Sequence, residues 1–349
     1  MHLTRRKALK ALAASATIGG AGCMRSETES TEPTSTQAST QQEEATVRAA
    51  FVYHDVVGDF GWQWAHEQGR RQIEAEFDWL ETEIFEKCDP NGSERRFEQY
   101  AQRGFDVIFG TSFDYMDPMA AVAPDFPEVK FEHCSGYKEL DNMGRYFGRM
   151  YQARYLSGIA AGLLTEADHI GYVAAFPIPE VIRGSNAFAL GVAQTAEDAT
   201  VRVSYTNTWN DSTMETGAAE RLLDAGVDVM AQHQNYPAAA QTASDAGAWA
   251  FGYNSPMGDI VGDNYVTSPI WNWAVFYRTA VTEVYNGTWE PDLYWKGLQS
   301  GLVTLSEWGP NVPAHVKEAV SAERGRILEG EADIWAGTPF EDYTDSELY

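Results

Sequence analysis

From residue 47 onward, short apolar runs alternate with longer segments of mixed polarity, and this pattern predicts strands and helices in regular succession. The apolar run at 49–53 is short and closely bounded, as expected of a buried strand. Turn-forming residues follow it, and a helical spacing then begins at Trp64. A strand, a glycine-containing loop and a helix in this order predict an open α/β sheet, whose ligands bind beyond the carboxyl ends of the strands.

Two series of such units indicate two similar α/β lobes. The predicted strands are 49–53, 81–88, 106–113, 129–135 and an edge strand at 143–149, then 170–176, 201–208, 227–232 and 249–253. The helix predicted at 151–165 is rich in small residues, which favours a closely packed or crossover position. We assign residues 47–165 and about 255–275 to the first lobe, 166–254 and about 276–330 to the second, and 331–349 to a C-terminal tail.

Residues 1–23 have the features of an export signal rather than of a folded segment. Arg5 and Arg6 form a twin-arginine pair, and the apolar stretch at 9–22 is too short to span a bilayer as a stable helix. Small residues directly precede Cys23, which predicts lipidation of that cysteine. The polar tract at 24–46 is predicted to be a disordered tether. Together these features predict a lipid-anchored protein on the extracytoplasmic face of the cell membrane.

The charge of the chain restricts the possible partners. With 25 basic and 51 acidic residues the formal net charge is −26, which excludes a protein that binds nucleic acid through its phosphates. An anionic small-molecule ligand is also disfavoured. Because the acidic residues are evenly spread and lysine is scarce, the composition is typical of a salt-adapted, halophilic protein.

The cysteines and histidines predict neither a disulfide scaffold nor a metal site. Besides Cys23, the chain has only Cys88 and Cys134, and both lie at the ends of predicted strands that another strand separates. A bridge between them is therefore disfavoured, although the sequence leaves it open. There is no CxxC pair, and the 7 histidines lack the spacing of metal ligands. We expect no metal and no other cofactor.

Aromatic residues stand beside amide, carboxyl or hydroxyl groups at the ends of most predicted strands. A single such pair is more often part of a core, but repetition along one sheet edge suits a flat polar ring, which needs stacking faces and hydrogen-bonding groups at its edge. The residues are Tyr53, Asp59, Trp62, Ser112, Phe113, Asp114, Phe176, Trp209, Asn210, Asp211, Tyr253, Asn254, Trp271, Asn272 and Trp273.

Signatures of common enzymes are missing from the sequence. There is no GxSxG elbow, no phosphate-binding GxxxxGK[ST] loop and no GxGxxG after the first predicted strand. Asp59 paired with Asp55 or Asp211 is the one arrangement that resembles a hydrolytic carboxylate pair, but no apolar pocket is evident that would separate their pKa values. The sequence therefore predicts a binding protein and not an enzyme.

Longer segments around these strand ends follow one another in a recognisable order: GDFGWQWAHEQGR, DVIFGTSFDYMDPM, FPEVKFEHCSGY, YFGRMYQARYLSGIAAG, IGYVAAFPIPEVIRGSNAFALG, NTWNDSTMETGAAERLLDAGVDVMAQH, FGYNSPM and TSPIWNW. In this order they resemble the basic membrane protein (BMP) family over residues 47–330. The resemblance implies an exported substrate-binding lipoprotein of an ABC importer, with a permease as its partner. It also implies a type I periplasmic-binding-protein fold, with two Rossmann-like lobes joined by three crossings and a purine in the cleft.

The same resemblance implies roles for individual residues. Trp62 and Trp209 take the places of the aromatic side chains that stack on the ligand from the two lobes, and Asp59, Gln63 and Phe113 fall at further ligand contacts. Phe176 ends the first strand of the second series and is included as a contact.

The sequence departs from the nucleoside-binding branch of the family. Asn254 stands where that branch has an aspartate for the ribose, and the nearby lysine is replaced in the stretch of Trp271 and Asn272. Losing both charged groups removes strong bonds to a sugar, which favours a free purine base such as adenine and leaves a nucleoside as the alternative. A ligand sensor that docks on a signalling partner would use the same fold and remains the other alternative.

Overall fold

The computed structural model describes residues 46–343. The predicted signal at 1–23 with Cys23, and the predicted tether up to residue 45, lie outside the described residues, as do residues 344–349. No helix among the described residues is both long and apolar enough to cross a membrane.

A six-stranded parallel sheet forms the centre of the first lobe. In sheet order its strands are β11 (Leu293–Lys296), β5 (Met143–Gly148), β4 (Lys130–Cys134), β3 (Val107–Gly110), β1 (Val47–Val52) and β2 (Leu80–Phe85). The predicted α/β class is thereby confirmed. The prediction that 143–149 is an edge strand is wrong, because β11 pairs with β5 on its outer side.

Helices cover both faces of this sheet because the side chains of its central strand alternate between two cores. Ala50 and Val52 of β1 face the core under α2 (Pro90–Gln102) and α3 (Met116–Val122), whereas Ala49 and Phe51 face the core under α1 (Gly61–Glu76) and α9 (Ala274–Asn286). The ring of Phe51 stacks on Phe109 of β3 with 4.6 Å between the ring centroids. All of β1 except Arg48 is buried, as a central parallel strand requires.

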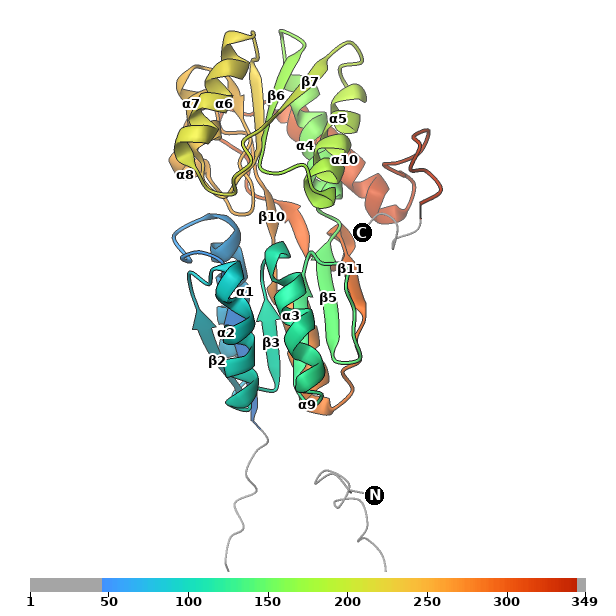
Figure 1. The fold of residues 1–349 in the computed structure, drawn as a ribbon. Coiled ribbons are helices and arrows are strands. Elements are labelled where there is room, and N and C mark those ends of the chain that lie inside the picture. Colours follow the sequence, from blue (N-terminus) through green and yellow to red (C-terminus); the bar gives the residue numbers. More distant parts are fainter. Residues whose placement is uncertain (1–45, 344–349) are drawn as a thin grey trace, which may run out of the picture. The chain divides into compact units, whose positions relative to one another are not determined.

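The second lobe contains a four-stranded parallel sheet with helices on both faces (Figure 1). Its strands, in sheet order, are β7 (Thr200–Tyr205), β6 (His169–Ala174), β8 (Val229–His233) and β9 (Trp249–Ala250). One face is covered by α4 (Met150–Leu164), α5 (Pro179–Ala193) and α10 (Ala314–Glu329), and the other by α6 (Ser212–Asp224), α7 (Ala238–Asp245) and α8 (Gly258–Val261).

Small residues allow α4 and α5 to approach each other very closely. A Cβ atom on Gly158 of α4 would lie 2.0 Å from the carbonyl oxygen of Phe188, and one on Gly191 of α5 would lie 2.0 Å from that of Tyr155. Both positions therefore require glycine. The close packing predicted for the small-residue helix is confirmed, with α5 as its partner.

Three segments connect the lobes, and they differ from the predicted boundaries. The chain leaves the first sheet between β5 and α4, returns through β10 (Pro269–Trp271), and crosses again between β11 and β12 (Val303–Leu305). β10 and β12 pair in an antiparallel ribbon, and Figure 1 shows β10 between the two sheets.

Three parts of the predicted lobe boundaries are therefore corrected. The helix α4 belongs to the second lobe, because it packs on α5, and α9 with β11 belongs to the first, because α9 packs on α1 and β11 extends the first sheet. The helix α8, in the stretch of about 255–275 that was assigned to the first lobe, belongs to the second, because it packs on α7.

The described part of the C-terminal tail packs on the second lobe. Trp335 is 4% exposed, and its ring lies 5.2 Å from that of Tyr151 on α4 and 5.7 Å from that of Phe340. Residues 331–343 therefore contribute to the fold.

Candidate functional site

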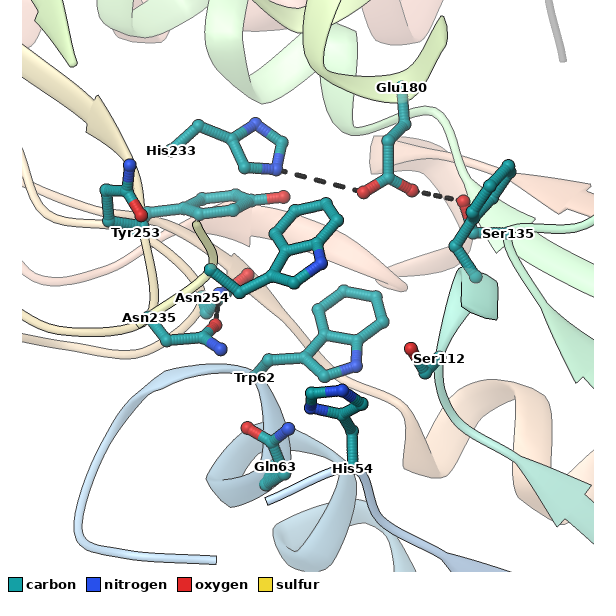
Figure 2. A pocket seen from close by; sticks show the side chains of 13 residues that line it. His54, Trp62, Gln63, Ser112, Ser135, Glu180, His233, Asn235, Tyr253 and Asn254 are labelled. Atoms are coloured by element: carbon teal, nitrogen blue, oxygen red, sulfur yellow. Dashed lines mark hydrogen bonds and ion pairs between the residues drawn. The ribbon is translucent and has the colours of Figure 1, made fainter. Parts of the chain in front are cut away.

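A cavity lies where the carboxyl ends of the two sheets face each other (Figure 2). About 500 Å³ of space between its walls is free of protein atoms, part of it open to solvent. Its lining residues follow strands β1, β3, β4, β6, β7, β8 and β9, or end them, as predicted for an open α/β sheet. They are His54, Trp62, Gln63, Ser112, Phe113, Ser135, Glu180, Trp209, His233, Gln234, Asn235, Tyr253 and Asn254.

Trp62, in the first turn of α1, is fixed by contacts within the first lobe. Its indole Nε1 donates a hydrogen bond of 2.6 Å to the carbonyl oxygen of Thr111, which follows β3. The rings of His66, Trp271 and Trp273 pack edge to face with it at centroid distances of 4.6, 5.8 and 5.5 Å. The orientation of the indole is therefore set without any hydrogen bond to a ligand.

The start of α1 comes into direct contact with the loop after β8. Gly61 has φ of +87°, and a Cβ atom there would lie 2.7 Å from the carbonyl oxygen of Asn235. Its N–H donates a 2.9 Å hydrogen bond to the Oγ of Ser255. Glycine is thus required both for the backbone conformation and for the contact between the lobes.

Two further contacts between the lobes lie beside the cavity. Asn210 donates a side-chain hydrogen bond to the carboxylate of Asp55, and the ring of Phe60 packs edge to face on Tyr236 at 6.1 Å. Together with the contact of Gly61, they show that the lobes are closed over the cavity.

The second-lobe wall carries its own group of aromatic side chains. Trp209, in the loop after β7, packs against Phe176 at 5.1 Å and lies 6.5 Å from the His233 ring. The ring of Tyr253, in the loop after β9, lies 4.3 Å from the ring of His233. Trp62 and Trp209 therefore border the cavity from different lobes, each held by neighbours of its own.

Glu180 is the one carboxyl group among the residues that line the cavity, and none of them is lysine or arginine. It lies in the first turn of α5, and Ser135, directly after β4 of the first lobe, donates its hydroxyl to Oε2. Burial raises the pKa of Glu180 to about 6, although the Ser135 hydrogen bond and Arg183 act in the opposite direction. His233 Nε2 lies 3.9 Å from Oε1 (Figure 2).

His233 is a neutral side chain at physiological pH. Burial lowers its pKa well below the usual value, and the positive charges of Arg154 and Arg183 lower it further. Arg154 is fully buried behind the cavity wall, where it donates a 2.8 Å hydrogen bond to the carbonyl oxygen of Gln232. Its guanidinium lies 3.7 Å from the centre of the Tyr253 ring, a cation–π contact that supports the wall from behind.

Side-chain amides form a separate polar part of the wall. Asn254 donates a 3.2 Å hydrogen bond to Asn235 and accepts one of 3.1 Å from the indole of Trp271. Its φ of +66° lies in the left-handed region, which asparagine tolerates better than most residues. Figure 2 shows Gln63, Asn235 and Asn254 grouped apart from Glu180 and Ser135.

The structure brings together Trp62, Gln63, Phe113, Trp209 and Asn254 of the predicted ligand contacts. The other four do not line the cavity. Asp59 is exposed in the loop before α1, and Asn272 is exposed in the hinge, where its backbone N–H bonds to Leu302. Phe176 supports Trp209, while Trp271 is buried behind Trp62 and stacks on Trp273 at 4.4 Å.

Ser112 and Tyr253, which the sequence placed among the strand-end groups without a specific ligand contact, also line the cavity. Six further lining residues were not predicted: His54, Ser135, Glu180, His233, Gln234 and Asn235. Most of them directly follow predicted strands, so applying the strand-end rule to every polar residue would have found them. Glu180 follows Pro179 at the start of a helix, where an acidic residue is common for reasons of helix stability alone.

Neither a metal centre nor a catalytic carboxylate pair is formed by this wall. No group of three or more His, Cys, Asp or Glu side chains among residues 46–343 could hold a metal ion. Cys88 and Cys134 are buried free thiols, and burial raises the pKa of both. The wall offers aromatic faces, amides, hydroxyls and one carboxyl, which suits recognition of a small polar ligand.

Comparison with known proteins identifies a family. Residues 46–332 match the model of the Bmp family, described as ABC transporter substrate-binding protein PnrA-like. TsgA13 of Haloferax volcanii, named as a candidate ABC transporter glucose-binding protein, is 47% identical over 99% of this chain and 94% of its own length. The purine-binding protein BAB2_0673 of Brucella abortus is 38% identical over 84% of each chain.

A solved structure supports the fold. An ABC transporter solute-binding protein from Conexibacter woesei superimposes with a TM-score of 0.69, covering 82% of this chain and 98% of its own at 22% identity. The architecture is that of the type I periplasmic-binding proteins, as expected from the sequence.

Proposed function

The chain belongs to the Bmp family of PnrA-like ABC transporter substrate-binding proteins, and from this premise we propose that its ligand is a purine base, with adenine as the model compound. As a member of this family it is an extracellular solute-binding component of an ABC importer and not an enzyme, and a permease is its partner.

The composition of the cavity wall is the observation that carries the proposal. Trp62 and Trp209 border the space from opposite lobes, which suits a flat ring held between two aromatic faces. Amide groups can pair with the donor and acceptor atoms at the edge of a base, as asparagine and glutamine do with adenine elsewhere. The purine-binding name of the 38% identical relative points in the same direction.

The surroundings of Asn254 favour a base over a nucleoside. Asn254 presents an amide and not a carboxylate, and no lysine or arginine lines the cavity, so this part of the wall lacks the charge-assisted hydrogen bonds that such groups would make to ribose hydroxyls.

Glucose is the second candidate, and the name of the 47% identical relative favours it. Indole rings, amides and a carboxyl can also bind a pyranose. The two ligands differ in what they need from the wall, because a purine uses both faces of a planar ring whereas a sugar depends mainly on hydrogen bonds from its hydroxyl groups.

Isothermal titration of the full chain, freed of any ligand that co-purifies, separates these candidates. We expect saturable binding of adenine, weaker binding of adenosine and no heat above dilution from D-glucose. Binding of D-glucose without binding of adenine would overturn the purine proposal and leave the family assignment untouched. Mass spectrometry of the compound released on denaturation provides an independent identification.

We also propose that a lipid on Cys23 anchors the protein to the membrane, on the strength of the twin-arginine pair and the small residues before Cys23. Cys23→Ser should release the protein into the medium with its melting temperature unchanged. A variant that stays in the membrane fraction at high salt would show that another attachment operates.

A further inference from the structure

We propose that Glu180 selects an unsubstituted ring N–H on the ligand, so that it distinguishes a free base from a base whose ring nitrogen carries a substituent. This inference rests on the proposed purine-base function. It assigns to Glu180 a role in specificity that the aromatic faces cannot supply, because those faces are the same for a base and for its N-substituted derivative.

The carboxylate of Glu180 has acceptor capacity left for a ligand. An ionised carboxylate can accept about four hydrogen bonds, and the hydroxyl of Ser135 takes one of them at Oε2. His233 Nε2 lies 3.9 Å from Oε1, which is beyond hydrogen-bond distance. Figure 2 shows the carboxyl group between His233 and Ser135 at the edge of the cavity, and Glu180 is among the lining residues.

No cationic side chain lines the cavity beside this carboxylate, because lysine and arginine are absent from the lining residues and His233 is neutral. The positive charge of Arg183 acts on Glu180 from outside the lining residues. A buried acceptor of this kind penalises any ligand that leaves it without a donor, and the penalty acts as selectivity. A ligand with an N–H at this place is therefore preferred, and an anionic ligand is rejected.

The positions of the amides indicate which N–H meets Glu180. Gln63, Asn235 and Asn254 lie apart from Glu180 and Ser135 in Figure 2. If the amides pair with the amino group and the adjacent ring nitrogen of adenine, the opposite edge of the ring, which carries the N9–H, turns toward Glu180. A methyl group or a ribose at N9 removes this donor.

Comparison of adenine with 9-methyladenine tests the proposal, because the methyl group removes the N–H and leaves the amino group and the stacking faces in place. We expect the wild-type chain to bind adenine roughly 30–100-fold more tightly, as titration calorimetry would measure. In Glu180→Leu, which is close to glutamate in size but accepts no hydrogen bond, the ratio should fall to about threefold or less. Glu180→Gln retains an uncharged acceptor and should give an intermediate ratio.

Asn210→Ala is the control for an effect on lobe closure. It removes a hydrogen bond between the lobes at a residue that does not line the cavity and leaves Glu180 and Ser135 in place, so both ligands should weaken by the same factor and the ratio should stay at its wild-type value. Circular dichroism of each variant confirms that the chain is folded.

Three results would overturn the proposal. A wild-type ratio that persists in Glu180→Leu would mean that the shape of the cavity excludes the methyl group. If the wild-type chain binds adenine and 9-methyladenine equally but does not bind unsubstituted purine, which lacks the amino group of adenine, then Glu180 contacts the amino group instead. Absence of binding to adenine itself would refute the proposed function as well. Failure of the inference alone would instead leave adenine bound by the wild-type chain.

Discussion

The first-lobe wall of the cavity carries no carboxyl group, lysine or arginine. The second-lobe wall carries Glu180 next to His233, and Arg154 supports that wall from behind through its contact with Tyr253. The first-lobe indole of Trp62 is locked by a backbone carbonyl and by three neighbouring rings. The second-lobe indole of Trp209 contacts Phe176 and His233 at the edge of its lobe.

This difference suggests a division of tasks between the lobes. An indole fixed by its own core provides a rigid stacking face that needs no rearrangement when a ligand arrives. The carboxyl group of Glu180 on the other lobe then determines which ring edge is accepted. Variants that affect one wall should therefore change stability and selectivity in different proportions.

The largest expected effect is on stability, at the base of the first-lobe wall. Trp273 is fully buried and stacks on both His66 and Trp271 at 4.4 Å. Trp273→Ala should lower the free energy of unfolding by about 3–5 kcal/mol, because it removes a large core side chain. Urea denaturation measures this loss. A loss below about 1 kcal/mol would show that the first-lobe wall is not part of its core.

Truncation of the two lining indoles should reduce binding by similar amounts and stability by different amounts. Trp62→Ala and Trp209→Ala should each weaken adenine binding about 10–100-fold, since stacking of a base on an aromatic ring contributes about 1–3 kcal/mol. Trp62→Ala should also lower the free energy of unfolding, because three rings pack against that indole.

The control for this pair is Trp335→Ala, which removes a buried indole of the C-terminal tail outside the cavity. It should destabilise the protein and leave the affinity of the folded chain for adenine unchanged. Equal losses of affinity in all three variants would mean that the indoles act through general stability and not through contact with the ligand.

The pH dependence of binding should come from the second lobe. Burial raises the pKa of Glu180 from 4.5 to about 6, so the ionised fraction of this side chain falls as pH decreases from 7.5 to 5. If the ligand donates to the carboxylate, adenine affinity should fall about tenfold over this range. Glu180→Gln should bind with little pH dependence, and a wild-type profile retained in that variant would assign the effect to another group.

The same pKa shift makes the stability of the ligand-free protein change with pH in the opposite direction to the affinity. Because the folded state holds the proton of Glu180 more tightly than the unfolded state, the stability that this group contributes is complete below pH 4.5 and is lost as pH rises through about 6. The loss is on the order of 2 kcal/mol. Chemical denaturation of the wild type and Glu180→Gln at pH 4.5 and 7.5 measures it.

The smallest expected effect concerns a contact between the lobes outside the cavity. Asn210→Ala removes the hydrogen bond to Asp55, which is partly exposed, and should weaken all ligands by about two- to fivefold. Because neither residue lines the cavity, the ratio of adenine to 9-methyladenine should not change. A change in that ratio would show that lobe closure contributes to selectivity.

The sequence predicted the elements of the fold better than their membership in the lobes. Short apolar runs located β1 to β9, whereas the short strands β10, β11 and β12 were not predicted as strands. The lobe to which α4 and the residues of β11 belong depends on the helix or strand that packs against them, and the local sequence pattern does not show which one that is. The prediction therefore placed α4 and β11 in the wrong lobes.

The site was partly predictable for a related reason. The rule that ligands bind beyond strand ends located Trp62, Phe113, Trp209 and Asn254, and the family resemblance added Gln63; all five line the cavity. The rule does not say which way a loop residue points, and Asp59 faces solvent. Glu180 was missed because its significance depends on Ser135, a partner 45 residues away that only the closed fold brings to it.

A crystal structure of the chain with adenine would test the division of tasks most directly. The account predicts the purine ring between Trp62 and Trp209, its amino edge toward Asn235 and Asn254, and its N9 within about 3.2 Å of a carboxylate oxygen of Glu180. A ring that lies elsewhere, or whose N9 faces the amides while Glu180 contacts no ligand atom, would contradict it.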